Sequence, residues 1–341
     1  MPKDHETDRL ATSADIDPVV ASTIDCVVIG RNEGDRLVRC LASLQGKFRR
    51  IVYVDSGSTD GSLEAAESSG AETVALDATR PFAASRARNA GLKALACRPP
   101  EFVQLIDGDC VLRDGWVEEA LGFMNETPAA AVVCGRRREL SLRTSVFNRL
   151  CDREWNTPVG RAKACGGDAV VRFDALKDIG GFREDLIAGE EPELCLRLRR
   201  EGWEIWRIDA EMTWHDAAIT RLPQWWSRTK RAGYAFAEGA AMYGRPPERH
   251  WKAETRRAVV WGLVLPSICV LASLASFAGL LLWLAYPLQV SRLAWREGIG
   301  RREAWEYAFF TVLGRVPEAI GVMSYHLRRL GARRSDLIEY K

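Results

Sequence analysis

The segment Phe102-Val103-Gln104-Leu105-Ile106-Asp107-Gly108-Asp109 joins a short apolar run to two carboxylates. An apolar run of this length is typical of a buried β-strand, so both carboxylates lie where the strand ends. The glycine between them allows close approach, and two carboxylates on such a turn suit a hard divalent cation that bridges to phosphate oxygens. Because Asp-Gly-Asp is also ordinary turn chemistry, this interpretation needs support from the rest of the chain.

The segments around this turn predict an α/β fold. Apolar runs and helical spacing alternate along the chain, at residues 24–30, 36–44, 50–55, 63–69, 71–76 and 85–96. Strands that alternate with helices need crossover connections, which give a mostly parallel, Rossmann-like sheet covered on both faces. Ligands of such sheets lie outside the carboxyl ends of the strands. We therefore expect the functional site at that edge.

Composition narrows the class of protein. The 48 Lys and Arg residues against 46 Asp and Glu residues leave a formal charge of +2, so the charge gives no reason to expect a nucleic-acid partner. The nine cysteines are scattered without zinc-finger spacing, which favours reduced thiols in a cytosolic domain. Residues 1–22 lack the apolar core of a signal peptide and are predicted to form a disordered tail, so we expect no export by an N-terminal signal.

Residues 258–291 contain no charged residue, which predicts a membrane segment. About 34 residues of helix would be roughly 51 Å long, against about 30 Å of hydrocarbon, so one straight span is too long. Positive charge prefers the cytoplasmic side, and both ends are flanked by basic residues, Lys252, Arg256, Arg257, Arg292, Arg296, Arg301 and Arg302. We predict a hairpin with both ends inside and a bend near Ser273, Ala275 and Ser276. The alternatives are a single tilted span and a buried soluble helix pair.

Amphipathic helices are predicted on both sides of this segment. Residues 221–257 contain Trp225 and Trp226 beside basic residues, a pattern typical of the membrane interface, although an ordinary helix that packs its Trp residues into the core would look similar. Residues 292–341 are predicted to form a second interface helix and a tail. Residues 23–220 then form the catalytic domain.

Four motifs occur in a fixed order ahead of the second half of the chain. They are VVIGRNEG at residues 27–34, VDSGSTDGS at 54–62, ARNAGL at 87–92 and IDGD at 106–109. This series resembles the nucleotide-binding half of family-2 glycosyltransferases with the A-type fold, over roughly residues 24–240. The resemblance implies a hexosyltransferase-like enzyme that takes a sugar from a nucleoside diphosphate sugar, most often one with uridine, although guanosine stays open.

The resemblance also implies roles for residues on the donor side. Nucleobase and ribose contacts match Arg31, Asn32, Glu33 and Asp55, and the diphosphate side matches Arg88 and Asn89. Asp107 matches the ribose carboxylate and a metal ligand, and Asp109 matches the main metal carboxylate, for Mn²⁺ or Mg²⁺. Gly167 and Asp168 belong to a Gly-Gly-Asp segment whose backbone can approach the sugar closely.

Two further segments resemble the acceptor and metal motifs of the family. In the run from Gly189 to Leu198, Glu191 stands at the position of the catalytic base, with Glu190 as the reserve. These glutamates also simply favour a helix N-terminus, which is compatible with that role. His215 matches an additional metal ligand, since a neutral imidazole coordinates well beside carboxylates. Arg228 is displaced from the motif of polymerising synthases, which argues against a processive enzyme.

The predicted reaction is an inverting displacement onto a lipid-linked acceptor, within cell-surface polysaccharide or glycolipid synthesis. The predicted location is the cytoplasmic face of the inner (plasma) membrane. One alternative is a sugar nucleotidyltransferase, which expects a better glycine-rich loop than residues 30–34 provide and needs no membrane segment. The other is a membrane scaffold that has lost catalysis, against which the combined presence of the carboxylates and His215 speaks.

Overall fold

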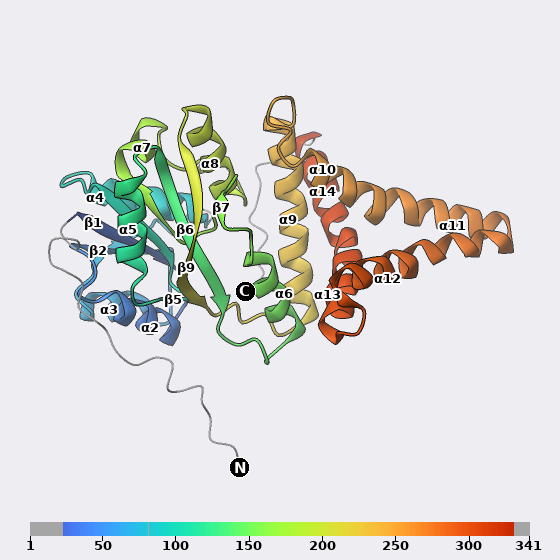
Figure 1. Cartoon of the computed structure of the whole chain (residues 1–341), viewed down its shortest axis with the longest axis horizontal. Coiled ribbons are helices and arrows are strands. Elements are labelled where there is room, and N and C mark those ends of the chain that lie inside the picture. Colours follow the sequence, from blue (N-terminus) through green and yellow to red (C-terminus); the bar gives the residue numbers. More distant parts are fainter. Residues whose placement is uncertain (1–22, 81, 331–341) are drawn as a thin grey trace, which may run out of the picture. The chain divides into compact units, whose positions relative to one another are not determined.

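The computed structural model describes residues 23–80 and 82–330 of the chain (Figure 1). The predicted tail at residues 1–22 and the last residues, 331–341, lie outside the described residues. The chain divides into two compact units. The sheet unit comprises the residues up to Leu140 together with Glu154–Arg183 and Leu194–Ala217. The helical unit comprises Ser141–Arg153, Glu184–Glu193 and the residues from Ala218 onward.

The first half of the sheet is parallel, as predicted. Strand β1 (Ile24–Gly30) lies between β2 (Ile51–Asp55) and β4 (Phe102–Asp107), and β3 (Glu72–Ala75) pairs with the far side of β2. Gly30 is the register partner of Asp55, and Ile29 is the partner of Asp107. The two strand-ending carboxylates therefore flank the carboxyl end of β1.

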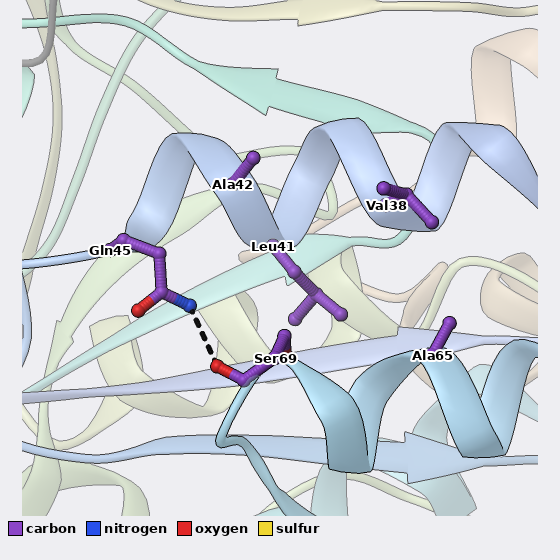
Figure 2. Close-up of a pocket in the computed structure, with 6 residues that line it drawn as sticks. All are labelled: Val38, Leu41, Ala42, Gln45, Ala65 and Ser69. Atoms are coloured by element: carbon purple, nitrogen blue, oxygen red, sulfur yellow. Dashed lines mark hydrogen bonds between the residues drawn. The ribbon is translucent and has the colours of Figure 1, made fainter.

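The helices that connect these strands pack against them through apolar faces. Helix α2 (Asp35–Leu44) buries four residues at helical spacing, and α3 (Ser62–Ser68) and α4 (Ala84–Leu95) follow the next two strands. A Cβ at Gly91 of α4 would come within 2.3 Å of Val27, so the glycine lets this helix lie directly on β1. A small groove between α2 and α3 is lined by Val38, Leu41, Ala42, Gln45, Ala65 and Ser69 (Figure 2). These six residues carry no charge, so the groove is a poor candidate for phosphate chemistry.

The second half of the sheet is mixed. Strand β8 (Ala169–Arg172) runs antiparallel between β4 and β6 (Ala130–Glu139). Strand β9 (Glu204–His215) is parallel to β6 and antiparallel to β5 (Cys110–Leu112) and β7 (Gly160–Arg161). Helices α5 (Trp116–Glu126), α7 (Phe173–Asp178) and α8 (Glu190–Arg200) complete this half. The fold is the predicted α/β fold with helices on a Rossmann-like sheet, but parallel pairing prevails only in the first four strands.

The reversed direction of β8 has a consequence for the site. Leu105 near the end of β4 pairs with Ala169 at the start of β8. A parallel strand at this place would begin at the opposite edge of the sheet. Because β8 runs backwards, the loop before it, which ends in Gly166-Gly167-Asp168, lies beside the end of β4.

In the helical unit, the Trp-containing face of α9 (Leu222–Tyr243) is in the protein interior. The ring of Trp225 lies 5.9 Å from that of Phe147, in α6 (Val146–Trp155), and 5.1 Å from that of Phe310, in α13 (Arg302–Leu313). Gly233 contacts the backbone of Glu318 in α14 (Arg315–Leu330) so closely that a Cβ would lie 2.1 Å from the carbonyl oxygen. The prediction that this face of α9 lies on a membrane is therefore wrong for Trp225, which packs as an ordinary core residue.

The uncharged segment forms a helical hairpin. Helix α10 (Lys252–Val259) continues through a π-helical turn, Val260–Val264, into α11 (Leu265–Ala275). Ser276 is extended and ends that arm, and the return arm is a 3₁₀ segment, Phe277–Leu284, followed by α12 (Ala285–Gly298). The bend falls where the sequence predicted it. Figure 1 shows the two arms side by side, extending away from α9 and α14.

Side chains hold the arms together, and apolar side chains cover their outside. The indole N–H of Trp283 donates to Ser273 Oγ at 3.2 Å, and the Tyr286 hydroxyl donates to the Trp261 carbonyl at 2.9 Å. Lys252–Ala275 and Phe277–Gly298 are each long and apolar enough to cross a membrane.

Candidate active site

Asp107, at the end of β4, lies between two arginines. Arg88 of α4 donates to its Oδ1 at 2.9 Å, and Arg137 of β6 lies 3.4 Å from its Oδ2. Burial raises the pKa of Asp107, but the positive charges of Arg88 and Arg137 outweigh this effect and hold the pKa below its usual value. Asp107 is therefore a fixed anion with about a quarter of its side chain, 26%, open to solvent.

Asp168 lies beneath this pair. Its side chain is fully buried and accepts hydrogen bonds from the Asp107 amide at 3.1 Å, from Arg137 Nε at 3.0 Å and from the Thr213 hydroxyl at 2.8 Å. A buried carboxylate with these three donors is well stabilised inside the protein. Among the predicted donor-binding residues, Asp168 is thus placed to hold Arg137 and Asp107 rather than to touch a ligand.

Gly167 packs directly on the Asp107–Arg88 ion pair. A Cβ at this position would lie 2.6 Å from Asp107 Oδ2 and 2.7 Å from an Arg88 guanidinium nitrogen. A Cβ at the preceding Gly166 would meet no atom within 4 Å. Gly167 therefore allows the backbone to approach Asp107 closely, and the approach to a sugar that the motif predicted stays a prediction.

Two of the three predicted metal ligands, Asp109 and His215, meet at the other end of the turn, whereas Asp107 is not part of this group. Asp109 Oδ1 and His215 Nε2 are 3.4 Å apart, and Cys110 and His215 are register partners on β5 and β9. The ligand atoms of Asp109, Cys110 and His215 all lie within 4.8 Å of one another. The antiparallel pairing of β5 with β9 thus brings two distant residues together. Asp109 lies in the two-residue connection between β4 and β5, and His215 ends β9.

The donor chemistry fits Mn²⁺ or Mg²⁺ better than a thiolate-loving metal. Burial raises the pKa of the Cys110 thiol well above its usual value, so this residue stays protonated and is a poor ligand. A carboxylate oxygen and an imidazole nitrogen remain, and phosphate oxygens are the kind of ligand that would complete such a shell. His215 Nδ1 is buried and has no hydrogen-bond partner within the described part of the chain.

Hydrogen bonds fix two of the residues that were predicted to contact the nucleobase and ribose. Asp55 is almost fully buried and accepts from the Tyr53 hydroxyl at 3.0 Å and from the backbone amides of Gly57 and Ser58. The Asn32 side chain accepts from the Thr59 amide at 2.8 Å. These bonds tie the loop after β1 to the loop after β2.

Two neighbours in the loop after β1 complete this edge. Glu33 pairs with Arg36 at 2.7 Å, and Arg31 is exposed at the rim. Asn32 and Asp55 thus hold the same loop, residues 57–59, while Arg31 and Glu33 lie beside Asn32 in the loop after β1.

Asn89 has a different surrounding from its neighbour Arg88. Its side-chain amide both accepts from the Phe182 amide at 2.9 Å and donates to the Phe182 carbonyl at 2.8 Å. It therefore anchors the Gly180-Gly181-Phe182 loop. A contact of Asn89 with diphosphate stays a prediction. In the structure, the Asn89 side chain fixes that loop.

The two candidate base residues belong to the helical unit, at the start of α8. Glu190 is nearly buried, whereas Glu191 is partly exposed. Gly189, just before them, has φ +82°, and a Cβ there would lie 2.4 Å from the Trp251 ring, so only glycine fits this turn. The positive end of the helix stabilises carboxylates at this position in their ionised form. Of the two, Glu191 is the more open to an acceptor.

Sequence reasoning missed three residues on the inner side of the site. Arg137 joins Asp107 to Asp168, Glu139 lies 3.9 Å from His215, and the Trp155 ring lies 4.6 Å from the His215 ring. The available signal was the run Arg136-Arg137-Arg138-Glu139 directly after an apolar strand. Charges that continue a buried strand need partners, and here the partners are the site residues.

With this geometry established, comparison with known proteins defines the class. Residues 25–180 match the model of glycosyl transferase family 2. This segment of the chain is thus a family-2 glycosyltransferase domain. The match covers the VVIGRNEG motif at residues 27–34, the Asp107-Gly108-Asp109 turn and the Gly167-Asp168 loop.

Particular relatives agree with this class. The chain is 29% identical to the pre-mycofactocin glycosyltransferase of Mycobacterium tuberculosis over 231 residues, which are 64% of this chain and 46% of the relative. It is 25% identical to the succinoglycan biosynthesis protein ExoA of Rhizobium meliloti over 192 residues, 52% of this chain and 57% of the relative. The chain thus spans about half the length of the curated relatives it matches.

A solved structure shows the same fold. The mannosyltransferase PcManGT from Pyrobaculum calidifontis, determined in complex with GDP-Man and Mn²⁺, superimposes with a TM-score of 0.63 at 17% identity, covering 93% of this chain and 92% of that chain.

Proposed function

We propose that this chain is an inverting, metal-dependent glycosyltransferase that moves a sugar from a nucleoside diphosphate sugar to a lipid-linked acceptor at the cytoplasmic face of the inner membrane. The observation that carries the proposal is the convergence of two pairs at one edge of the sheet. One pair is the fixed anion Asp107 with Arg88, and the other is Asp109 with His215.

These two pairs suit the two ends of a donor. Asp109 and His215 would hold a Mn²⁺ or Mg²⁺ ion, which supplies positive charge for the leaving diphosphate when bound. Asp107, kept ionised by Arg88 and Arg137, offers a carboxylate to ribose hydroxyls. Gly167 leaves space above it. PcManGT, with its bound GDP-Man and Mn²⁺, supports a nucleotide-sugar donor of this kind.

On the acceptor side, Glu191 takes the proton of the acceptor hydroxyl as that oxygen attacks the anomeric carbon. The bond from this carbon to the diphosphate oxygen breaks, and the electron pair leaves with the diphosphate. Attack from the opposite face inverts the configuration at the anomeric carbon. The relative named for succinoglycan biosynthesis supports a glycan acceptor.

The hairpin supports a membrane-bound acceptor. From Ala258 to Ala275 the first arm rises about 27 Å at 1.5 Å per residue. The return arm rises about the same, with 2.0 Å per residue in its 3₁₀ part. Each arm thus nearly matches the roughly 30 Å hydrocarbon layer. Uncharged arms with basic residues at both outer ends fit a hairpin that enters from the cytoplasmic side and returns to it.

A second surface favours the same location. Where α12 meets α13, the exposed large apolar residues are Trp295, Ile299, Trp305 and Phe309. The Trp305 indole donates to the Ile299 carbonyl at 2.8 Å, which fixes the turn between the helices. Exposed aromatic residues close in sequence to arginines are typical of the headgroup region. We therefore place this corner at the membrane interface.

The first experiment is a binding and turnover panel on detergent-purified protein. UDP, GDP and their common sugars are tested with and without Mn²⁺, by thermal shift and by product analysis with lipid extracts as acceptors. We expect one nucleotide to stabilise the protein only with metal, UDP being the first candidate and GDP the second. The Asp109→Ala variant should lose this effect, and Glu119→Gln, an exposed carboxylate on α5, should keep it. Folded protein that responds to no nucleotide would support the inactive scaffold instead.

A further inference from the structure

The imidazole of His215 lies between two carboxylates. Its Nε2 is 3.4 Å from Asp109 Oδ1, and its Nδ1 is 3.9 Å from Glu139 Oε2. Nδ1 is buried and lacks a hydrogen-bond partner among residues 23–80 and 82–330, and the Trp155 ring meets the imidazole edge-on with centroids 4.6 Å apart. The ring therefore has a defined orientation in which Nε2 faces the metal carboxylate and Nδ1 faces Glu139.

Glu139 is built into this place by the backbone. It is the register partner of His215 on the neighbouring parallel strand, and its exposed fraction is 0%. Its Oε2 accepts from the Ala217 amide at 3.1 Å, two residues beyond His215. The His215 carbonyl in turn accepts from the Leu140 amide at 2.9 Å. The ends of β6 and β9 are thus tied together on both sides of the His215 ring.

Strand β6 serves both halves of the site in the same way. Arg137 and Glu139 are two residues apart, so a strand presents them on the same face. Arg137 contacts Asp107 and Asp168, and Glu139 faces His215. One strand therefore places a buried cation behind the ribose-side carboxylate and a buried anion behind the histidine ligand.

We propose that Glu139 is a positioning residue for His215, and this inference rests on the proposed metal-dependent function. A small rotation of the ring closes the 3.9 Å gap, so that Nδ1–H donates to Glu139 and the Nε2 lone pair is aimed beside Asp109. Carboxylates that orient a histidine ligand in this way affect metal affinity about 10- to 100-fold. Glu139 itself touches neither metal nor substrate in this role.

The test is Mn²⁺ binding to the full chain in detergent, without donor, with free Mn²⁺ followed by electron paramagnetic resonance. We expect Glu139→Gln to raise the dissociation constant for Mn²⁺ about tenfold or more. The matched control is Glu211→Gln, an exposed carboxylate on β9 that pairs with Arg138, which should stay within about twofold of wild type. Turnover of Glu139→Gln should recover at saturating Mn²⁺, because the ligands themselves are intact.

Each outcome decides something different. Folded Glu139→Gln that binds Mn²⁺ like wild type overturns the role of Glu139 and leaves the proposed function standing. Wild-type protein that binds no Mn²⁺, with or without nucleotide, overturns both.

If Glu139→Gln does not fold, ¹⁵N-histidine spectra of the wild-type protein with Mg²⁺ answer the question. The chain has four histidines, and His215→Gln identifies the signal. A proton on Nδ1 supports the inference, and a proton on Nε2 overturns it.

Discussion

The strand-end site and the hairpin depart in opposite ways from the usual distribution of residues, in which charged side chains are exposed and apolar side chains are buried. In the sheet unit, the charged residues Asp168, Glu139 and Arg88 are almost completely buried. In the helical unit, Leu274 and Phe277 at the bend are 80% and 91% exposed. Charged residues are ordinarily outside, and a contiguous exposed apolar surface is unusual.

The difference lies in where the compensation comes from. The buried charges are compensated inside the protein, since Arg137 and Arg88 neutralise the carboxylates around them. Asp109 and His215 are buried in the same site and form the pair that we propose binds the metal ion. The apolar side chains around the bend have no such internal compensation, because their outer surface faces solvent in the structure. A group of buried, paired charges therefore indicates a functional site, whereas an exposed apolar hairpin indicates an environment other than water.

The largest expected effect comes from charging the hairpin. Two aspartates near the middle of the arms, in Ile268→Asp/Leu284→Asp, should weaken membrane partitioning by about 5 kcal/mol, or three to four orders of magnitude. Flotation of the protein with liposomes that contain anionic lipid measures this. Val38→Asp, at an exposed apolar position on α2 of the sheet unit, is the control and should float like wild type. If the double variant floats as well as wild type, the hairpin is not the membrane anchor.

The next effect is on catalysis. Glu191→Gln keeps the size of the side chain and removes the base, so kcat should fall about 100- to 10,000-fold with little change in donor binding. The matched variant, Glu190→Gln, changes a nearly buried neighbour and should cost less than tenfold. Single-turnover measurements with saturating donor separate the two. A larger loss in Glu190→Gln would transfer the role of the base to that residue.

Local patterns predicted the parts of the fold that depend on neighbours in sequence. Apolar runs ending in Asp55 and Asp107 gave the parallel strands and their common edge, and the small residues around Ser276 gave the bend. The approach of His215 to Asp109 followed only from the family resemblance. It depends on the pairing of β5 with β9, which joins residues about one hundred positions apart, and no local pattern encodes it.

The missed residues have the same physical origin. Arg137 and Glu139 look like a surface charge run, because a sequence does not show that β6 has β8 and β9 on either side. The helix with Trp225 was predicted for the membrane because an amphipathic face has the same pattern whether it meets lipid or protein. Close contacts such as Gly233 against Glu318 distinguish these cases, and they exist only in the folded chain.

A smaller effect tests the packing of the sheet-unit site. In Gly167→Ala, the new methyl group would press on Asp107 and Arg88, at a cost of about 1–3 kcal/mol. We expect kcat/KM for the donor to fall about 5- to 150-fold. Gly166→Ala is the control one residue away, where a Cβ meets open space, and it should behave like wild type. Equal effects at both positions would show that loop flexibility, and not the contact with Asp107, is what matters.

The smallest effect concerns an ion pair in the helical unit that is less buried than those of the site. Glu306 of α13 accepts from Arg149 at 2.7 Å and from Arg302 at 2.8 Å. Burial raises its pKa, but these hydrogen bonds outweigh it, so the pKa of Glu306 in the folded protein is below its usual value. A lowered folded pKa stabilises the protein above the unfolded pKa of about 4.3, and this contribution is lost as the pH falls through the folded value.

Glu306→Gln should therefore lower the melting temperature by about 1–2 °C at pH 7, as expected for roughly 1 kcal/mol in a chain of this size. The difference from wild type should shrink as the pH falls below the unfolded pKa of about 4.3, and it should vanish below the lower folded pKa, where the folded glutamate is protonated as well. Glu303→Gln, exposed on the same helix, is the control and should change little at either pH. A difference that persists unchanged at low pH would mean that Glu306 contributes through shape and packing rather than charge. The contrast between compensated charges and uncompensated apolar surface would then not extend to this pair.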